Sequence, residues 1–194
     1  MSQIKIGDGT GHAYLAKVDG LNRLATYGPA EHQVKAAAKY GNAYGFGLND
    51  IAVPANAPVT IAWARFDDPS RNFHIDSVVG AWNGGSTNYN RPLSMLMYIG
   101  TQPPTANHVA VPLGNMNLAS SNVALATSYV WTGVGLGMTV PAGGQPANRA
   151  FFAQGTSVIP YNGGFIFPKG MSLSIVLSAP EAGLASLFVG GWFE

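Results

Sequence analysis

His74 and Asp76 are the one local pair whose residue types and spacing suggest acid–base or metal chemistry. Two residues apart in an extended chain, they point to the same side of a strand, about 7 Å from each other. The remaining histidines, His12, His32 and His108, are far away in the sequence, and no third metal ligand can be named. A solvent-facing polar role is therefore favoured for this pair, with metal binding and catalysis as alternatives.

A glycine-rich segment, Gly7-Asp8-Gly9-Thr10-Gly11-His12, suggests anion binding, because successive backbone amides in such a turn can cradle a phosphate. Its spacing fits neither nucleotide-binding fingerprint, and no Gly-Lys-Ser/Thr follows it. The segment is typical of a turn.

Asp67 and Asp68 are adjacent, so in an extended chain their side chains point to opposite sides. They do not make the facing carboxylate pair that glycoside hydrolysis requires. The following Pro69 indicates a turn, and a calcium site remains an alternative, although no spaced series of oxygen ligands is present.

Acidic residues are missing from the whole stretch between Asp76 and Glu181. General acid–base catalysis needs a carboxylate or histidine with a partner, and this stretch offers only His108. A Gly-x-Ser-x-Gly elbow, the usual mark of a serine hydrolase, is also missing. The sequence therefore predicts no enzyme, no catalytic residue, no metal and no cofactor.

The low charge of the chain favours an assembly protein over a free monomer. Of its 194 residues 10% are charged, against about 25% in ordinary soluble domains, and charge is what keeps isolated surfaces apart. The net charge of +1, without a run of like charges, argues against nucleic-acid binding. No cysteine is present for a disulfide or thiolate site, and no apolar run reaches the roughly 18 residues that a membrane span requires.

Two parts are expected: an extended N-terminal arm with a short helix over residues 1–40, and a β-sandwich body over residues 41–194. Glycine recurs through residues 1–30 and disfavours a helix there. The Ala-rich run 31–40, ended by Gly41, is the one good helix candidate.

Alternating apolar residues predict the strands of the body. The segments expected to be strands are 58–66, 73–79, 94–99, 124–131, 151–152, 158–167, 171–177 and 184–193. Asn83-Gly84-Gly85-Ser86 is expected to open a polar loop that reaches about Pro92. Seven or eight strands at roughly ten-residue spacing indicate an all-β, jelly-roll-like antiparallel sandwich.

Trp63, Trp82, Trp131 and Trp192, with eight Tyr and nine Phe, fit a core or a subunit interface better than a sugar platform. A glycan site remains an alternative on the polar loop. Its expected contacts are Trp82, Asn83, Asn88, Tyr89 and Asn90.

Several segments resemble virion proteins of tailed bacteriophages that are encoded among head genes. The segments that carry the resemblance are Gly7-Asp8-Gly9-Thr10-Gly11, Ala16-Lys17-Val18-Asp19, Asn22-Arg23-Leu24, Asn42-Ala43-Tyr44, Tyr98-Ile99-Gly100-Thr101 and the run from Phe167 to Ile175. The first and last of these carry most of it. The middle strands depart from the family pattern, being rich in Trp and Met.

The resemblance implies a capsid cement or decoration protein, made in the host cytoplasm and bound to the outside of the virion capsid, commonly as a homotrimer. The major capsid protein would be its partner. The residues expected to contact the capsid or a sister subunit are Ile4, Ile6, Leu15, Val18 and Leu24. A neck or tail accessory role and a glycan-binding virion module are the alternatives.

Overall fold

The computed structural model describes residues 40–84, 92–133, 137–140 and 143–194, residues 37–38, and three N-terminal strands. The chain divides into two compact units, residues 1–32 and 33–194. In the first unit β1 (Gln3–Gly7), β2 (Ala13–Val18) and β3 (Leu24–Ala25) form a small antiparallel sheet in the order β1-β2-β3. The short helix expected over residues 31–40 lies outside the described residues except at 37, 38 and 40.

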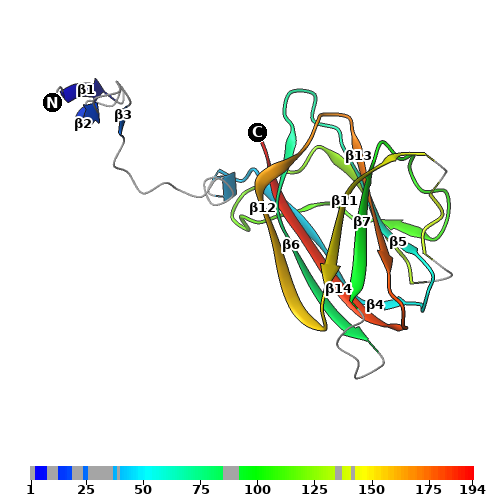
Figure 1. Ribbon diagram of the computed structural model, residues 1–194. Coiled ribbons are helices and arrows are strands. Elements are labelled where there is room, and N and C mark those ends of the chain that lie inside the picture. Colours follow the sequence, from blue (N-terminus) through cyan, green and yellow to red (C-terminus); the bar gives the residue numbers. More distant parts are fainter. Residues whose placement is uncertain are drawn as a thin grey trace. The chain divides into compact units, whose positions relative to one another are not determined.

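The second unit is a sandwich of two antiparallel sheets (Figure 1). Its strands are β4 (Ala43–Val53), β5 (Val59–Phe66), β6 (Phe73–Gly84), β7 (Leu93–Ile99), β8 (His108–Ala110), β9 (Gly114–Asn115), β10 (Ala126–Trp131), β11 (Gln145–Phe152), β12 (Gly155–Phe167), β13 (Ser172–Ser178) and β14 (Gly183–Phe193). The six-stranded sheet has the order β11-β7-β13-β5-β10-β8, and the five-stranded sheet has the order β12-β6-β14-β4-β9.

The pairing of the eight long strands is that of a jelly roll. The first of them, β4, pairs with the last, β14; β5 pairs with β13, β6 with β12, and β7 with β11. This is a long hairpin rolled into two sheets, which is how a jelly roll is built. The jelly-roll-like sandwich predicted from strand spacing is therefore confirmed, and β8, β9 and β10 are additions from the long connection between β7 and β11.

The core lies between the two sheets and is made of alternate residues from both. On β13, for example, Leu173, Ile175 and Leu177 are at most 1% exposed. An aromatic cluster closes one end: the Phe66 and Phe73 rings stack at 4.3 Å, and Phe193 meets Phe73 edge to face at 5.1 Å. No helix in the described part of the chain is long and apolar enough to cross a membrane.

A β-bulge in β6 changes which residues face the core. Gly190 of β14 pairs with Ser77, but Gly191 pairs with Ile75, so Asp76 is an extra residue on β6. Because side chains alternate along a strand, one extra residue reverses the alternation. Uniform alternation through Phe73, Ile75, Ser77 and Val79 was the expectation, and it is wrong beyond the bulge: the side chains of Val78 and Trp82 are buried instead.

Candidate functional site

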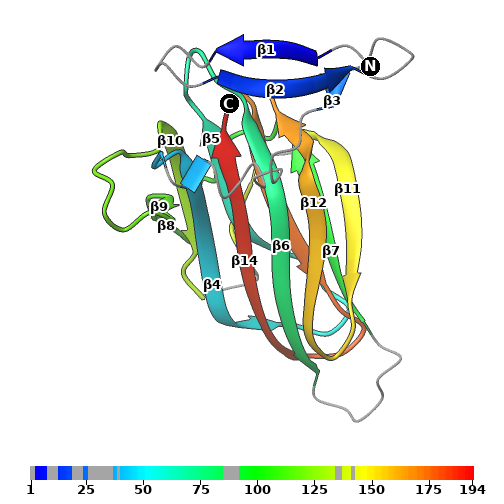
Figure 2. The same cartoon turned by 90° about the vertical axis from the view of Figure 1, so that its left-hand side faces the viewer.

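The outer face of the five-stranded sheet carries mostly uncharged residues, with the exposed Asp50 of β4 at one end, and its uncharged part is here called the neutral face. Figure 2 shows four of its strands, β12, β6, β14 and β4, side by side. Cross-strand pairing arranges its outward residues in rows, one of which runs Gly47, Phe188, Val79, Val158. The members of the neutral face are Gly45, Gly47, Ala52, Ser77, Val79, Ala81, Asn83, Thr156, Val158, Pro160, Leu184, Ser186, Phe188 and Gly190.

Glycines let the Phe188 ring lie flat on this sheet. A Cβ atom at Gly45 would come within 2.6 Å of the ring's Cζ atom, and one at Gly190 within 3.1 Å of its Cε1 atom. Any larger residue at these positions would push the ring away from the strands. On this surface Phe188, Val158 and Leu184 remain 36%, 60% and 46% exposed.

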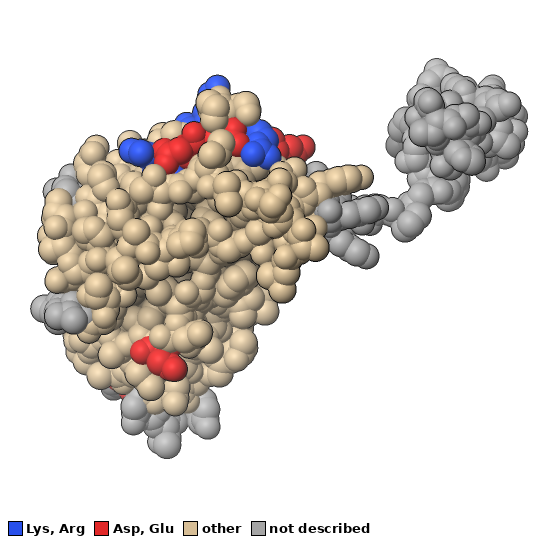
Figure 3. Space-filling model, turned by 180° about the vertical axis from the view of Figure 1, so that it is seen from behind, with Lys and Arg blue, Asp and Glu red and all other residues tan. Residues whose placement is uncertain are grey.

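Charged residues collect instead at one end of the sandwich, here called the charged end: Arg65, Asp67, Asp68, Arg71, Lys169 and Glu194. At this end the β5–β6 turn meets the C-terminus, since Asn72 and Glu194 exchange two backbone hydrogen bonds. In the view of Figure 3 the blue and red atoms gather at one end, and the remaining described surface is tan apart from one red group. The carboxylates nearest to the neutral face along its strands are Asp50 on β4 and Asp76 on β6.

Asp68 holds the charged end together. It is 2% exposed and accepts hydrogen bonds from the Ser70 amide at 2.9 Å, the Ser70 hydroxyl at 2.9 Å and Arg71 Nε at 2.8 Å. Burial alone would raise its pKa, but these donors outweigh burial and lower the pKa of Asp68 to about 2. Arg71 in turn donates to Asn42 and lies over the Phe193 ring, 5.3 Å from its centroid.

Asp67 has different partners from its neighbour. It accepts from Arg65 Nε at 2.6 Å and from the Thr127 hydroxyl at 2.7 Å. Burial opposes ionisation here too, and these two hydrogen bonds outweigh it and lower the pKa of Asp67. The two carboxylates therefore act as separate turn anchors, as the sequence predicts. Among the described residues, no group of three His, Asp or Glu side chains is placed to hold a metal ion.

His74, the first member of the predicted acid–base pair, contacts three other residues. Its ring stacks on Trp192 at 5.3 Å, its Nδ1 lies 3.2 Å from the Gly163 carbonyl oxygen, and its Nε2 lies 3.8 Å from Glu194. Asp76 follows it at the bulge. The stacked ring covers Trp192, which is 3% exposed.

Trp82 cannot stack on a sugar, because it is 2% exposed and belongs to the core cluster. Sequence reasoning placed it beside a surface loop, but β6 continues to Gly84 and the bulge at Asp76 turns Trp82 inward. Asn83 is exposed on the neutral face. Asn88, Tyr89 and Asn90 lie outside the described residues.

Asn83 instead lies at a pocket of about 260 Å³ at one end of the neutral face. Asp50, Thr156, Leu184 and Ser186 line the same pocket. Asp50 has a φ of 52°, a left-handed conformation that few residues other than glycine adopt, and its amide donates to the Ser186 hydroxyl at 3.2 Å. Sequence reasoning missed this group, because Asp50 and Asn83 come from distant strands.

The five arm residues predicted to contact a capsid all lie in β1, β2 or β3. The register pairs Ile4 with Ala16, Lys5 with Leu15, and Val18 with Leu24. The apolar pairs of the arm thus belong to strands that pair with one another. The glycine-rich segment lies, after Gly7, outside the described residues.

Comparison with known proteins does not add a family to this description. No protein-family model matches the chain, and neither a curated protein nor a solved structure matches it.

Proposed function

We propose that this chain is a structural virion protein that binds the outer surface of a bacteriophage capsid and stabilises it, with the major capsid protein as its partner. The sequence resemblance described above supports this assignment. So does the architecture, by analogy, since jelly rolls are common among viral capsid proteins, although one fold serves many functions.

The neutral face is the observation that carries the proposal. Its exposed residues include Phe188, Val158 and Leu184, and none of its members is charged. Depletion of charge and enrichment of aromatic residues mark the buried centre of protein interfaces. Apart from the pocket at Asn83, this surface suits another protein surface better than a small ligand, which needs a concave site.

Capsid stabilisation follows from selective binding. A protein that binds the assembled shell and not its free subunits shifts the equilibrium toward the shell by mass action. In the proposed arrangement the neutral face packs against the shell or a sister subunit of a homotrimer. The arm, with Ile4, Ile6, Leu15, Val18 and Leu24, adds strand pairing to an exposed sheet edge.

Co-sedimentation with capsids tests the proposal. Purified capsids of the phage that encodes the chain, assembled without it, are mixed with the full-length protein and with two matched variants. Val158→Lys places a charge on the neutral face and should reduce capsid binding by about tenfold or more, because the charge must be desolvated. Val123→Lys, at a position that is 76% exposed and lies off the face, should bind normally.

Deletion of residues 1–24 tests the contribution of the arm to capsid binding apart from that of the neutral face. The proposal expects capsid binding to be lost while the body stays folded. Full binding by both the deletion variant and Val158→Lys, with circular dichroism showing a folded body, would overturn it.

A glycan-binding virion module is the second candidate, favoured by the pocket beside the neutral face. Asp50, Asn83, Thr156 and Ser186 offer the carboxylate, amide and hydroxyl groups that hydrogen-bond sugar hydroxyls. A glycan array should then give binding that is lost in Asn83→Ala. A blank array with the folded full-length protein would remove this candidate.

A further inference from the structure

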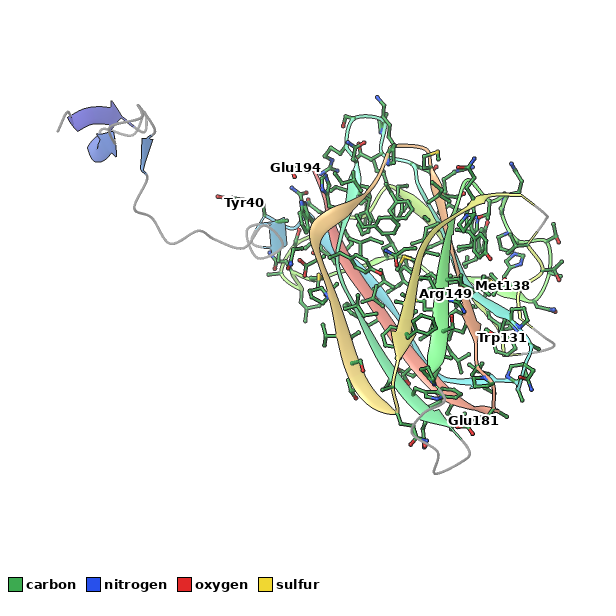
Figure 4. The ribbon with its side chains drawn as sticks, viewed as in Figure 1. Tyr40, Trp131, Met138, Arg149, Glu181 and Glu194 are labelled. Atoms are coloured by element: carbon green, nitrogen blue, oxygen red, sulfur yellow. The ribbon has the colours of Figure 1, made fainter. Side chains whose placement is uncertain are left out.

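The outer side of the other sheet has a pocket of about 440 Å³ around Arg149 of β11. Ser94, Phe151, Ser178, Asn56 and Pro180 also line it. Figure 4 labels Arg149 over the middle of the sandwich, away from Glu181 and Glu194 at its two ends. Its volume falls within the range of about 300–1,000 Å³ that is typical of small-molecule sites.

Three neighbouring strands build the floor of this pocket. Phe151 of β11 pairs with Ser94 of β7, and Ser94 pairs with Ser178 of β13. Arg149 precedes Phe151 by two residues and so extends from the same side of β11. Side chains on paired strands are held more firmly than side chains on loops, so the donors keep fixed positions.

One wall of the pocket is also fixed. Asn56, in the turn between β4 and β5, donates its amide hydrogen to the Ala179 carbonyl oxygen at 2.8 Å. A bridge between Ala55 and Ala179 lies beside that bond. The turn is thus tied to the end of β13, next to the Ser178 hydroxyl.

Arg149 is a cation whose charge is not balanced by a neighbour. Its Nε donates to the Ser94 hydroxyl at 3.1 Å, and its Cζ lies 4.9 Å from the centroid of the Phe151 ring. These two contacts orient the guanidinium. In the described part of the chain no carboxylate lies within ion-pair distance of Arg149, and the pocket lining includes no acidic residue.

We infer that this pocket binds a carboxylate-bearing sugar, such as a uronic acid. A guanidinium matches a carboxylate with two parallel hydrogen bonds. The one cation of the pocket balances the single charge of a carboxylate but not the double charge of a sulfate or a fully ionised phosphate. The hydroxyls of Ser94 and Ser178 and the Asn56 amide group suit sugar hydroxyls. Phe151, which is 57% exposed, offers ring surface for the apolar side of a pyranose.

Titration with D-glucuronate, followed by NMR on the full-length protein, tests the site. Saturable binding is expected for D-glucuronate, with D-glucose, which lacks the carboxylate, binding at least about tenfold more weakly. Arg149→Gln should weaken glucuronate binding about tenfold or more, and Arg149→Lys should weaken it less. Arg65→Gln is the matched control, since Arg65 is paired with Asp67 at the charged end.

Phe151→Leu provides a second variant in case Arg149→Gln does not fold, and it should weaken glucuronate binding several-fold. Failure of glucuronate to bind the folded protein would overturn the inference. Equal binding of inorganic sulfate would also overturn it, because charge alone would then select the ligand. Capsid binding by Arg149→Gln should stay normal, so this site and the proposed capsid contact can fail independently.

Discussion

The neutral face and the charged end belong to the same sandwich but differ in charge: the charged end carries paired charged side chains, and the neutral face is built of uncharged residues. At the charged end, Asp68 is buried among donors, and its partner Arg71 also covers the Phe193 ring. The members of the neutral face are uncharged, with Asp50 at the pocket at its end, and Phe188 and Val158 stay exposed to solvent. Charge that is paired within the fold stabilises that fold, whereas a surface without charge can be buried against a partner at little desolvation cost.

Turns explain why the charges gather where they do. The β5–β6 turn contributes Asp67, Asp68 and Arg71, and the β12–β13 turn contributes Lys169. Lys169 donates from Nζ to the Pro69 carbonyl oxygen at 3.1 Å, which ties the two turns together. Most members of the charged end thus come from turns, although Arg65 lies near the end of β5.

Two phenylalanines of β14 give the largest expected contrast between the regions. Phe193 is 3% exposed and supports the charged end, so Phe193→Ala should lower the free energy of unfolding by about 3–5 kcal/mol. Phe188 lies on the neutral face, so Phe188→Ala should cost only about 1–2 kcal/mol. Urea unfolding of both variants measures the difference. Equal losses of unfolding free energy in the two variants would mean that Phe188 contributes as much to the stability of the fold as Phe193 does.

Asp68 should account for part of the acid sensitivity of the fold. Asp68→Asn should cost about 2–3 kcal/mol near neutral pH, because it removes charge-assisted hydrogen bonds from a buried group. The pKa of Asp68 is about 2 in the fold and 3.8 ordinarily, so its stabilising effect is complete above the ordinary value and is lost as pH falls through about 2. Asp67 acts in the same direction.

Stability measured by urea unfolding at several pH values checks this expectation. The original protein should lose stability steeply between pH 3.8 and about 2, and the Asn variant should lose less over the same window. Parallel curves for the two proteins would show that Asp68 is not the group responsible.

Two glycines of β4, Gly45 and Gly47, test how closely the Phe188 ring packs against the neutral face. The expected change in stability is the smallest of these predictions. Gly45→Ala should cost about 1–2 kcal/mol, because its Cβ would lie 2.6 Å from Phe188 Cζ and 2.9 Å from the Val189 carbonyl oxygen. Gly47→Ala should be close to neutral, since its nearest neighbour would be 3.5 Å away. Thermal melts of the pair provide the comparison, and identical melting temperatures would mean that Phe188 does not depend on the glycine at position 45.

The sequence predicted the regular strands of the fold well. Alternation placed strands at 171–177 and 184–193, and β13 and β14 lie at Ser172–Ser178 and Gly183–Phe193. Strand spacing also predicted the jelly roll, because each strand ends in turn residues that can be recognised locally. By contrast, β4 was missed and β11 was expected only at 151–152.

These features were not predicted because they depend on pairing between residues that are distant in the sequence. Gly45, Gly47 and Asp50 are residue types common in loops, so the local sequence does not indicate the strand β4. In the fold, the Phe188 side chain of β14 packs over the two glycines. The bulge at Asp76 depends on the register of β14, so no local pattern shows that Trp82 points inward. The neutral face, the pocket at Asp50 and the pocket at Arg149 were missed for the same reason, since each draws its residues from several strands.

Cryo-electron microscopy of capsids decorated with this protein is the most direct test of the role assigned to the neutral face. The proposal predicts that Phe188, Val158 and Leu184 are buried against the shell or a sister subunit, while Arg65, Lys169 and the rest of the charged end stay in solvent. A reconstruction in which the neutral face points to solvent in every copy, or in which no copy binds the shell, would contradict it.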